Sequence, residues 1–367
     1  MKSINYAKWI ACNAVVFAAI ELLDAPLRAG GNTTTFALMF VVKFLAATAI
    51  AYCCMAFCNK TIWRLGYLPL ALYTVLFCDA FADLGALITI ASKIKVENKS
   101  IILISLVFLI LYLLYGTLNS QIISPRKHKY TSEKLKKTYK FVFISDLHYG
   151  SAQTEKTVDN ALRKVKDLNP DFMILGGDIT DERTSAEDMK RIYEMIGSLG
   201  LDVFFVYGNH DLQSHGHYLS GPTFTPEELE EAITGNGIKI LRDEMVQWAD
   251  DLVILGREDG EDKERRLKVD QLPERPDKAF TICIDHTPYL EDDILATGAD
   301  LQLSGHTHAG QLFPLRYVYK LGVRNIYGEY RRGDTILYVS PGISGWYFPF
   351  RTEANCNYEV ITLSPKH

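Results

Sequence analysis

Four long apolar runs follow one another in the first third of the chain. They cover residues 9–23, 36–58, 65–90 and 101–118. A helix needs roughly 17–25 apolar residues to cross a bilayer, so the last three runs are long enough, whereas the first is short and contains Asn13. We therefore expect about four membrane-spanning helices over residues 1–120, with buried helices of a soluble core as the alternative.

Short β-rich runs alternate with helical patterns after residue 140. Strands are expected at residues 141–145, 172–175, 203–207, 252–255, 280–284, 301–303, 335–339 and 358–363. Residues 154–168 and 186–199 have the apolar spacing of helices. Strands separated by helices predict a largely parallel sheet covered by helices, in which ligands gather at the carboxyl ends of the strands.

Charge is distributed unevenly along the 367 residues. Residues 1–120 hold 14 charged side chains, 9 basic and 5 acidic, whereas residues 121–367 hold 30 basic and 39 acidic ones. This contrast excludes a single soluble globule. Residues 141–367 carry 23 basic and 38 acidic side chains, which argues against nucleic acid as a partner, because neutralising phosphates requires a basic face.

Basic residues flank the predicted helices mostly on one side. Residues 126–140 contain seven basic side chains and one acidic one, and Lys8 and Arg64 fall on the same side if there are four spans. Three lysines between residues 93 and 99 lie on the other side and weaken the bias. Because Lys and Arg prefer cytoplasmic loops, we expect an integral protein of the cell inner membrane with its charged domain in the cytoplasm. Residues 121–140 are interpreted as a basic linker that lies against anionic headgroups of membrane lipids.

Lys43 lies inside the second apolar run, and Asp79 and Asp83 lie inside the third. A hairpin of these two runs would bring Lys43 to the depth of Asp79. Since an isolated charge is costly in a bilayer, we expect a structural pairing between the lysine and the carboxylates. A proton or ion path is the alternative interpretation.

Each of five predicted strands ends in a cluster of potential metal ligands. The clusters are Asp146-Leu147-His148, Gly176-Gly177-Asp178, Gly208-Asn209-His210-Asp211, Asp285-His286 and Gly305-His306-Thr307-His308. Alternate residues of a strand share a face, so Asp146 and His148 can converge on one ion, as can His306 and His308. Each cluster alone is weak evidence, but five of them, each directly after a β-rich run, predict a metal centre.

The order of these clusters resembles the five motifs of the calcineurin-like metallophosphoesterase superfamily over about residues 141–363. Four longer stretches narrow the resemblance to one branch of this superfamily. They are ISDLH at 144–148, GDITD at 177–181, SGHTHAGQ at 304–311 and Gly345-Trp346 before Arg351. They are similar to the branch of transmembrane proteins with a metallophosphoesterase domain, which is itself similar to the UDP-2,3-diacylglucosamine pyrophosphatases of lipid A synthesis. Ala309 stands where this branch commonly has glycine, which removes no ligand. The resemblance implies an N-terminal four-helix transmembrane block followed by an α/β metallophosphoesterase domain over residues 141–367, an αββα sandwich with mixed sheets.

The resemblance also implies a site for two divalent metal ions. The first ion would be bound by Asp146, His148 and His308. The second would be bound by Asn209, His286 and His306, with Asp178 bridging both. His210 would donate a hydrogen bond or proton to the phosphate or leaving group, and Asp211 would orient it. Asn209 and Arg351 would contact the substrate.

The chemistry of these ligands narrows the choice of metal and reaction. Mixed carboxylate and imidazole ligands suit manganese, iron or zinc, and we favour manganese. Two such cations stabilise the attacking and leaving oxygens of an in-line displacement and activate water. We therefore expect hydrolysis in a single step, without a serine or cysteine nucleophile.

Of the functional properties, the substrate is the one that the sequence predicts least precisely. Residues 316–332 mix basic residues with tyrosines and residues 346–351 are largely aromatic, which indicates either a wall that binds a headgroup or an ordinary hairpin and packed corner. Membrane attachment favours a phosphorylated lipid or glycolipid. The leading hypothesis is hydrolysis of a phosphodiester or pyrophosphate bond in a lipid-linked or nucleotide-activated glycolipid resembling UDP-2,3-diacylglucosamine. The alternatives are a phosphoprotein or phosphomonoester phosphatase and a non-catalytic membrane sensor or scaffold with a vestigial metal site. The oligomeric state is not predicted.

Overall fold

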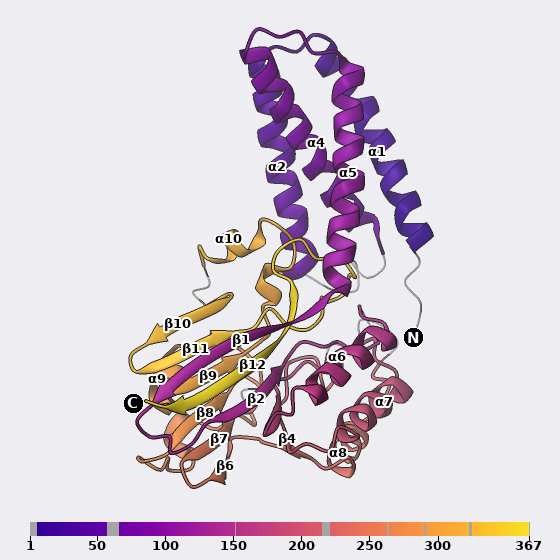
Figure 1. Cartoon of the computed structure of the whole chain (residues 1–367). Helices are drawn as coiled ribbons and strands as arrows, with labels where there is room; N and C mark the ends of the chain where they lie inside the picture. The colour runs from indigo at the N-terminus through magenta and orange to yellow at the C-terminus, as the bar shows by residue number, and fades with distance from the viewer. Residues whose placement is uncertain are drawn as a thin grey trace. The chain divides into compact units, whose positions relative to one another are not determined.

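The computed structural model describes residues 6–56, 66–150, 152–214, 221–262, 264–289, 291–322 and 325–366. The chain divides into two units (Figure 1). The helical unit contains the N-terminal helices up to residue 118 together with the short segment Leu312–Leu315. The α/β unit contains Asn119–Gln311 and the chain from Arg316 onwards.

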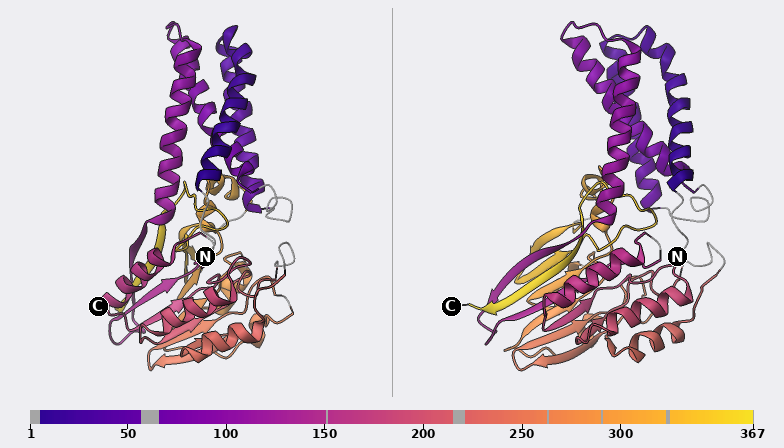
Figure 2. Two further views of the ribbon diagram at one scale, coloured as in Figure 1. Left: turned by 90° about the vertical axis from the view of Figure 1, so that its right-hand side faces the viewer. Right: turned by 45° about the vertical axis from the view of Figure 1, so that its right-hand side comes forward.

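The helical unit consists of four long helices that lie side by side (Figures 1 and 2). They are α1 (Tyr6–Ala29), α2 (Thr33–Ala56), α4 (Leu68–Ala91) and α5 (Asn98–Gln121). Each has 24 residues and is long and apolar enough to cross a membrane. The prediction of four long apolar helices is confirmed. The first span was expected to end at residue 23, but α1 continues to Ala29 because its charged residues find partners inside the bundle.

The α/β unit contains two six-stranded mixed sheets (Figure 1). The first sheet has the order β1 (Ile123–Ser132), β12 (Cys356–Pro365), β2 (Tyr139–Ile144), β3 (Phe172–Leu175), β4 (Val203–Phe205) and β5 (Ile238–Ile240). The second has the order β10 (Gly328–Arg332), β11 (Thr335–Val339), β9 (Leu301–Ser304), β8 (Phe280–Ile284), β7 (Leu252–Gly256) and β6 (Glu244–Ala249). Strands β2, β3 and β4 run parallel, as do β7, β8, β9 and β11.

The two sheets pack face to face because alternate strand residues point to opposite sides. In β2, Phe141 and Phe143 lie in the core between the sheets, whereas Val142 and Ile144 pack against helices. Those helices are α6 (Glu155–Asp167), α7 (Ala186–Gly197) and α8 (Pro226–Gly235), which Figure 2 shows alongside one another. The outer face of the second sheet is covered by the short helix α9 (Glu291–Thr297). The expected αββα sandwich with mixed sheets is therefore the observed architecture.

Residues 121–140 are not a linker, contrary to the sequence-based expectation. Residues Ile123–Ser132 form β1, which pairs in parallel with β12 at the other end of the chain. Two of its basic residues face partners within the unit: His128 Nε2 lies 2.8 Å from the Glu359 carboxylate, and Arg126 bonds the Tyr327 hydroxyl. The strand was missed because charged residues break its apolar pattern and its partner lies more than 200 residues away.

Candidate metal centre

The five polar clusters all follow the carboxyl ends of strands in the α/β unit. Asp146 and His148 follow β2, Asp178 follows β3, and Asn209 and His210 follow β4. His286 follows β8, and His306 and His308 follow β9. Because β2, β3 and β4 are parallel neighbours, as are β8 and β9, the loops after them meet at one edge of the sandwich.

The first group of possible ligands consists of Asp146, His148 and His308. One ligand atom from each lies within 4.8 Å of the others. The Nε2 atoms of His148 and His308 are 3.1 Å apart, and His308 Nε2 is 3.7 Å from Asp146 Oδ1. Two imidazole nitrogens that face each other at this distance need a proton or a cation between them, because two lone pairs would repel.

The second group consists of Asp178, His286 and His306, whose ligand atoms also lie within 4.8 Å of one another. His286 Nε2 is 3.1 Å from Asp178 Oδ2, and His306 Nδ1 is 2.9 Å from the side-chain oxygen of Asn209. The same Asp178 Oδ2 lies 3.8 Å from His148 Nε2. One carboxylate oxygen thus stands between the two groups.

The ligand loops have an unusual backbone conformation. Asp146, His148, Asp178, His306 and His308 all have φ between 45° and 72°, the left-handed region that non-glycine residues rarely adopt. Such residues cost of order 1–3 kcal/mol each and persist where surrounding structure holds them, commonly at functional sites. Backbone bonds from Leu147 and His148 to the Asp178 carbonyl, 2.8 and 3.0 Å, fasten two of these loops together.

We expected alternation along the strands to bring the ligands together, but the ligands lie in turns beyond the strand ends. Asp146 and His148 lie beyond the end of β2, and His306 and His308 lie beyond β9. His306 and His308 do not converge: His306 joins the second group and His308 the first. Glycine is needed beside them, since a Cβ on Gly305 would lie 2.3 Å from Asp146 Oδ2.

Backbone carbonyls orient two of the imidazole rings. His286 Nδ1 lies 2.8 Å from the Gly176 carbonyl, and His308 Nδ1 lies 3.2 Å from the Ser344 carbonyl. In the neutral form of each ring, donation from Nδ1 leaves the Nε2 lone pair for a metal. Burial and the nearby charge of His286 lower the pKa of His306 to about 3, and burial also lowers the pKa of His308. These two imidazoles are therefore neutral at physiological pH, the form that binds metals.

The residues fit divalent cations. Asp146 Oδ2 and His286 Nε2 are buried and have no hydrogen-bond partner among the described residues. Burial raises the pKa of Asp146, so its charged form needs a compensating cation. Burial would likewise raise the pKa of Asp178. The positive charges of His286 and His210 lower this pKa by more, so Asp178 stays ionised. The donor set of carboxylates and imidazoles suits a transition metal rather than calcium.

Asp211 does not orient His210, contrary to expectation. Its carboxylate accepts backbone N–H groups of Asp178, Ile179, Thr180 and Gly208 at 2.8–3.0 Å. It therefore holds the loops after β3 and β4 together. The partner of His210 is Glu182, whose carboxylate oxygens lie 2.9 and 3.0 Å from Nδ1.

Glu182 was missed by the sequence analysis, although the acidic pair Asp181-Glu182 directly after the second cluster was a usable signal. The neighbouring Asp181 reaches His148, with Oδ2 3.4 Å from Nδ1. Burial opposes the charged form of His210, but Asp178 and Glu182 outweigh it and raise the pKa of His210 to about 10. The ring of Trp346 packs against His210, with centroids 5.2 Å apart.

Changing Glu182 to glutamine is expected to lower kcat by about 10–100-fold, the typical cost of removing a group that orients a histidine in a metal site. The change removes a charge that raises the pKa of His210. If His210 acts as an acid, activity is lost as pH rises through its pKa, so this loss should move to lower pH in Glu182→Gln. The pH dependence of kcat checks this, with the exposed Glu187→Gln as control. An unshifted profile would exclude this role for Glu182.

Arg351 bonds backbone carbonyls in the interior of the α/β unit. Its side chain is fully buried, with Nη1 2.8 Å from the Ser344 carbonyl and Nη2 2.8 Å from the His308 carbonyl. Nη2 also bonds the Pro341 carbonyl. Arg351 thus joins the loop after β11 to the loop after β9 that carries His308, and the expected substrate contact has no support from its position. The family pattern predicted a functional role for this arginine, but a sequence pattern does not give the direction of its side chain.

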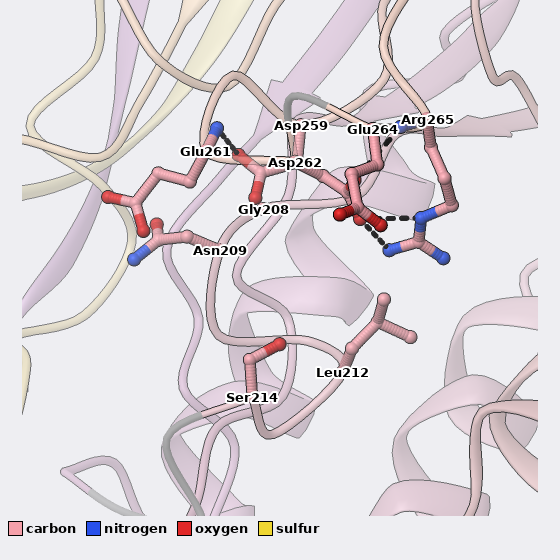
Figure 3. A pocket seen from close by; sticks show the side chains of 9 residues that line it. All are labelled: Gly208, Asn209, Leu212, Ser214, Asp259, Glu261, Asp262, Glu264 and Arg265. Atoms are coloured by element: carbon pink, nitrogen blue, oxygen red, sulfur yellow. Dashed lines mark hydrogen bonds and ion pairs between the residues drawn. The ribbon is translucent and has the colours of Figure 1, made fainter.

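A pocket of about 390 Å³ opens beside Asn209 (Figure 3). It is lined by Gly208, Asn209, Leu212, Ser214, Asp259, Glu261, Asp262, Glu264 and Arg265. Arg265 is paired with Asp262 at 2.5 Å, so the charged side chains that remain in the lining are all acidic. Burial raises the pKa of Asp259 to about 6. His215 and His217, in the loop that follows the third cluster, lie outside the described residues.

Comparison with known proteins agrees with this geometry. The family model for calcineurin-like phosphoesterase matches residues 139–310. An uncharacterized metallophosphoesterase of Campylobacter jejuni is 28% identical over 352 residues, covering 90% of each chain. A transmembrane protein with metallophosphoesterase domain of Danio rerio is 27% identical over 368 residues, covering 89% of this chain and 80% of that one. An uncharacterized metallophosphoesterase of Helicobacter pylori is 30% identical over 240 residues, covering 64% and 62%.

Proposed function

Because residues 139–310 are a calcineurin-like phosphoesterase domain and four membrane helices precede them, we propose that this membrane-anchored phosphoesterase hydrolyses a phosphodiester or pyrophosphate bond in a lipid-linked substrate. The observation that supports this most strongly is the position of Asp178. Its Oδ2 atom lies between His148 of one ligand group and His286 of the other. A single carboxylate at that point suits a pair of cations better than one.

Seven residues would hold the two cations in this proposal. The first ion is assigned to Asp146, His148 and His308, the second to Asn209, His286 and His306, and Asp178 to both. When bound, such a pair supplies positive charge to the phosphate oxygens and lowers the pKa of water. Manganese remains the favoured metal of the three that suit these ligands.

His210 is the proposed proton donor. Glu182 holds its Nδ1 atom, which fixes the ring and supports its charged form. A protonated His210 beside Asn209 can donate to a phosphate oxygen or to the leaving group, which needs a proton when the bond breaks. Asp211 stabilises the two ligand loops by accepting hydrogen bonds from their backbone N–H groups.

The acidic pocket bears on the choice of substrate. Its carboxylates would repel a second anionic group, whereas sugar hydroxyls or an amine can donate hydrogen bonds to them. The narrower proposal, a glycolipid resembling UDP-2,3-diacylglucosamine, places its phosphates at the metal centre and its sugar in this pocket. Membrane anchoring favours a substrate that stays in the lipid phase. We propose a location in the cell inner membrane with the catalytic domain in the cytoplasm, supported by the basic residues that follow the last span.

Hydrolysis of two test esters by the full-length protein in detergent tests the proposal. The protein is stripped with a chelator and assayed with bis-p-nitrophenyl phosphate and p-nitrophenyl phosphate, before and after Mn²⁺ is restored. We expect no turnover after chelation, recovery with Mn²⁺ and preference for the diester. Preference for the monoester would instead favour a phosphatase. Absence of turnover while Mn²⁺ is demonstrably bound would favour a non-catalytic sensor or scaffold.

A further inference from the structure

A cluster of six ionisable side chains lies inside the helical unit, among apolar helices. Its members are Glu21, Asp24 and Arg28 on α1, Lys43 on α2, and Asp79 and Asp83 on α4. None is more than 9% exposed. Asp79 is the twelfth of the 24 residues of α4, so it lies roughly 16 Å from either end of that helix. Asp79 and Lys43 therefore lie near the middle of their helices, whereas Arg28 is the next-to-last residue of α1.

Four of these side chains form a neutral frame. The Asp79 carboxylate bonds Arg28 Nη2 at 2.6 Å and Lys43 Nζ at 2.5 Å. The Asp83 carboxylate bonds Arg28 Nε at 3.0 Å and Lys43 Nζ at 2.5 Å. Each aspartate thus bridges both cations, and the predicted pairing of Lys43 with these carboxylates is confirmed. Two cations and two carboxylates are sufficient for a cluster whose role is only structural.

Glu21 and Asp24 are in excess of that frame. Glu21 Oε2 bonds Arg28 Nη1 at 2.6 Å, but its Oε1 is buried and has no hydrogen-bond partner among the described residues. Asp24 bonds Lys43 Nζ. With all six groups ionised, four carboxylates and two cations give a net charge of −2. A net charge buried at this depth is costly, so the two surplus carboxyls require further positive charge.

A metal ion does not fit this requirement. Oxygens of Asp24, Asp79 and Asp83 lie within 4.8 Å of one another, as the ligands of an ion would. Lys43 Nζ bonds all three, so the ammonium holds the position that an ion would take. A proton needs no such space. We propose that the helical unit transfers protons across the membrane through Glu21 and Asp24, which the neutral frame holds in place.

A polar pair extends the cluster along the same helix interface. The Thr74 hydroxyl on α4 donates to the side-chain oxygen of Asn13 on α1 at 2.8 Å, and both residues are buried. Thr74 lies five residues before Asp79, about 7.5 Å along the helix. The polar seam between α1 and α4 therefore continues toward their N-terminal ends. In the proposed cycle a carboxylate accepts one proton from water on one side and releases one to water on the other, so the protein returns to its starting state and one positive charge crosses the membrane.

Proton flux into sealed vesicles tests this inference independently of hydrolysis. The full-length protein is reconstituted in phosphatidylethanolamine–phosphatidylglycerol vesicles that enclose a pH-sensitive dye, and valinomycin sets a potassium diffusion potential. We expect wild-type vesicles to acidify faster than protein-free ones. Glu21→Gln and Asp24→Asn should lose this excess rate, and Glu97→Gln, whose side chain is 59% exposed, should keep it.

Three results would overturn the proposal: wild-type vesicles no faster than empty ones, both variants as fast as wild type, or flux that requires sodium. Because a variant that fails to assemble would also lose proton flux, each is accepted only if it elutes as wild type and hydrolyses the test diester at the wild-type rate. Glutamine and asparagine preserve the size of the side chains they replace. If one variant fails this check, the other decides the outcome.

Discussion

Replacing Asp178 with asparagine is expected to lower kcat/KM by about 10³-fold or more, equivalent to about 4 kcal/mol of transition-state stabilisation. The residue is buried, and its Oδ2 is the atom that stands between both ligand groups. An amide carries no charge to offset two cations. The backbone N–H of His210, which now donates to Asp178 Oδ1 at 2.9 Å, still finds an acceptor in the amide oxygen, so the loop keeps its shape.

Steady-state hydrolysis of the diester with Mn²⁺ measures this effect. Asp167→Asn, a matched change at an exposed position near the end of α6, should behave as wild type. Comparable activity of Asp178→Asn and wild type, with the fold intact, would show that the Asp178 carboxylate does not bridge two cations.

Replacing Lys43 with methionine is expected to destabilise the helical unit by about 3–5 kcal/mol, the usual cost of removing one partner from a buried ion pair. Lys43 bonds carboxylates of Asp24, Asp79 and Asp83, which would be left with only Arg28 as a counter-charge. Methionine is similar in length to lysine, so the loss of stability reflects the missing charge rather than poorer packing.

Denaturation of the full-length protein in mixed micelles, followed by far-ultraviolet circular dichroism, gives the free energy of unfolding. Lys95→Met is the control, because Lys95 is exposed between α4 and α5. Equal stability of Lys43→Met and wild type would mean that the lysine does not neutralise the cluster.

The sequence predicted the parts of the structure that depend on local pattern. Residues 172–175 and 280–284 are the observed β3 and β8, because both strands are buried on two faces and read as unbroken apolar runs. The apolar runs likewise located all four long helices. The ligand clusters were visible because each lies next to such a strand.

The sequence could not predict features that depend on the direction of a side chain or on a distant partner. Strand β1 exists because β12 pairs with it. Arg351 and Asp211 were assigned to substrate and to His210, but each bonds backbone groups instead, since the turns around them rotate them inward. The ion pairs of Arg28 with Asp79 and of Asp24 with Lys43 join helices that are distant in sequence, so the pattern of the first run alone could not predict them.

Manganese binding tests the central claim most directly. The chelated full-length protein is reconstituted with Mn²⁺, and metal content and electron paramagnetic resonance are recorded for wild type and Asp178→Asn. We predict two Mn²⁺ ions per wild-type chain with a spin-coupled spectrum, and loss of that coupling in the variant. A wild-type chain that binds one ion or none, or two uncoupled ions, would contradict a cation pair bridged by Asp178.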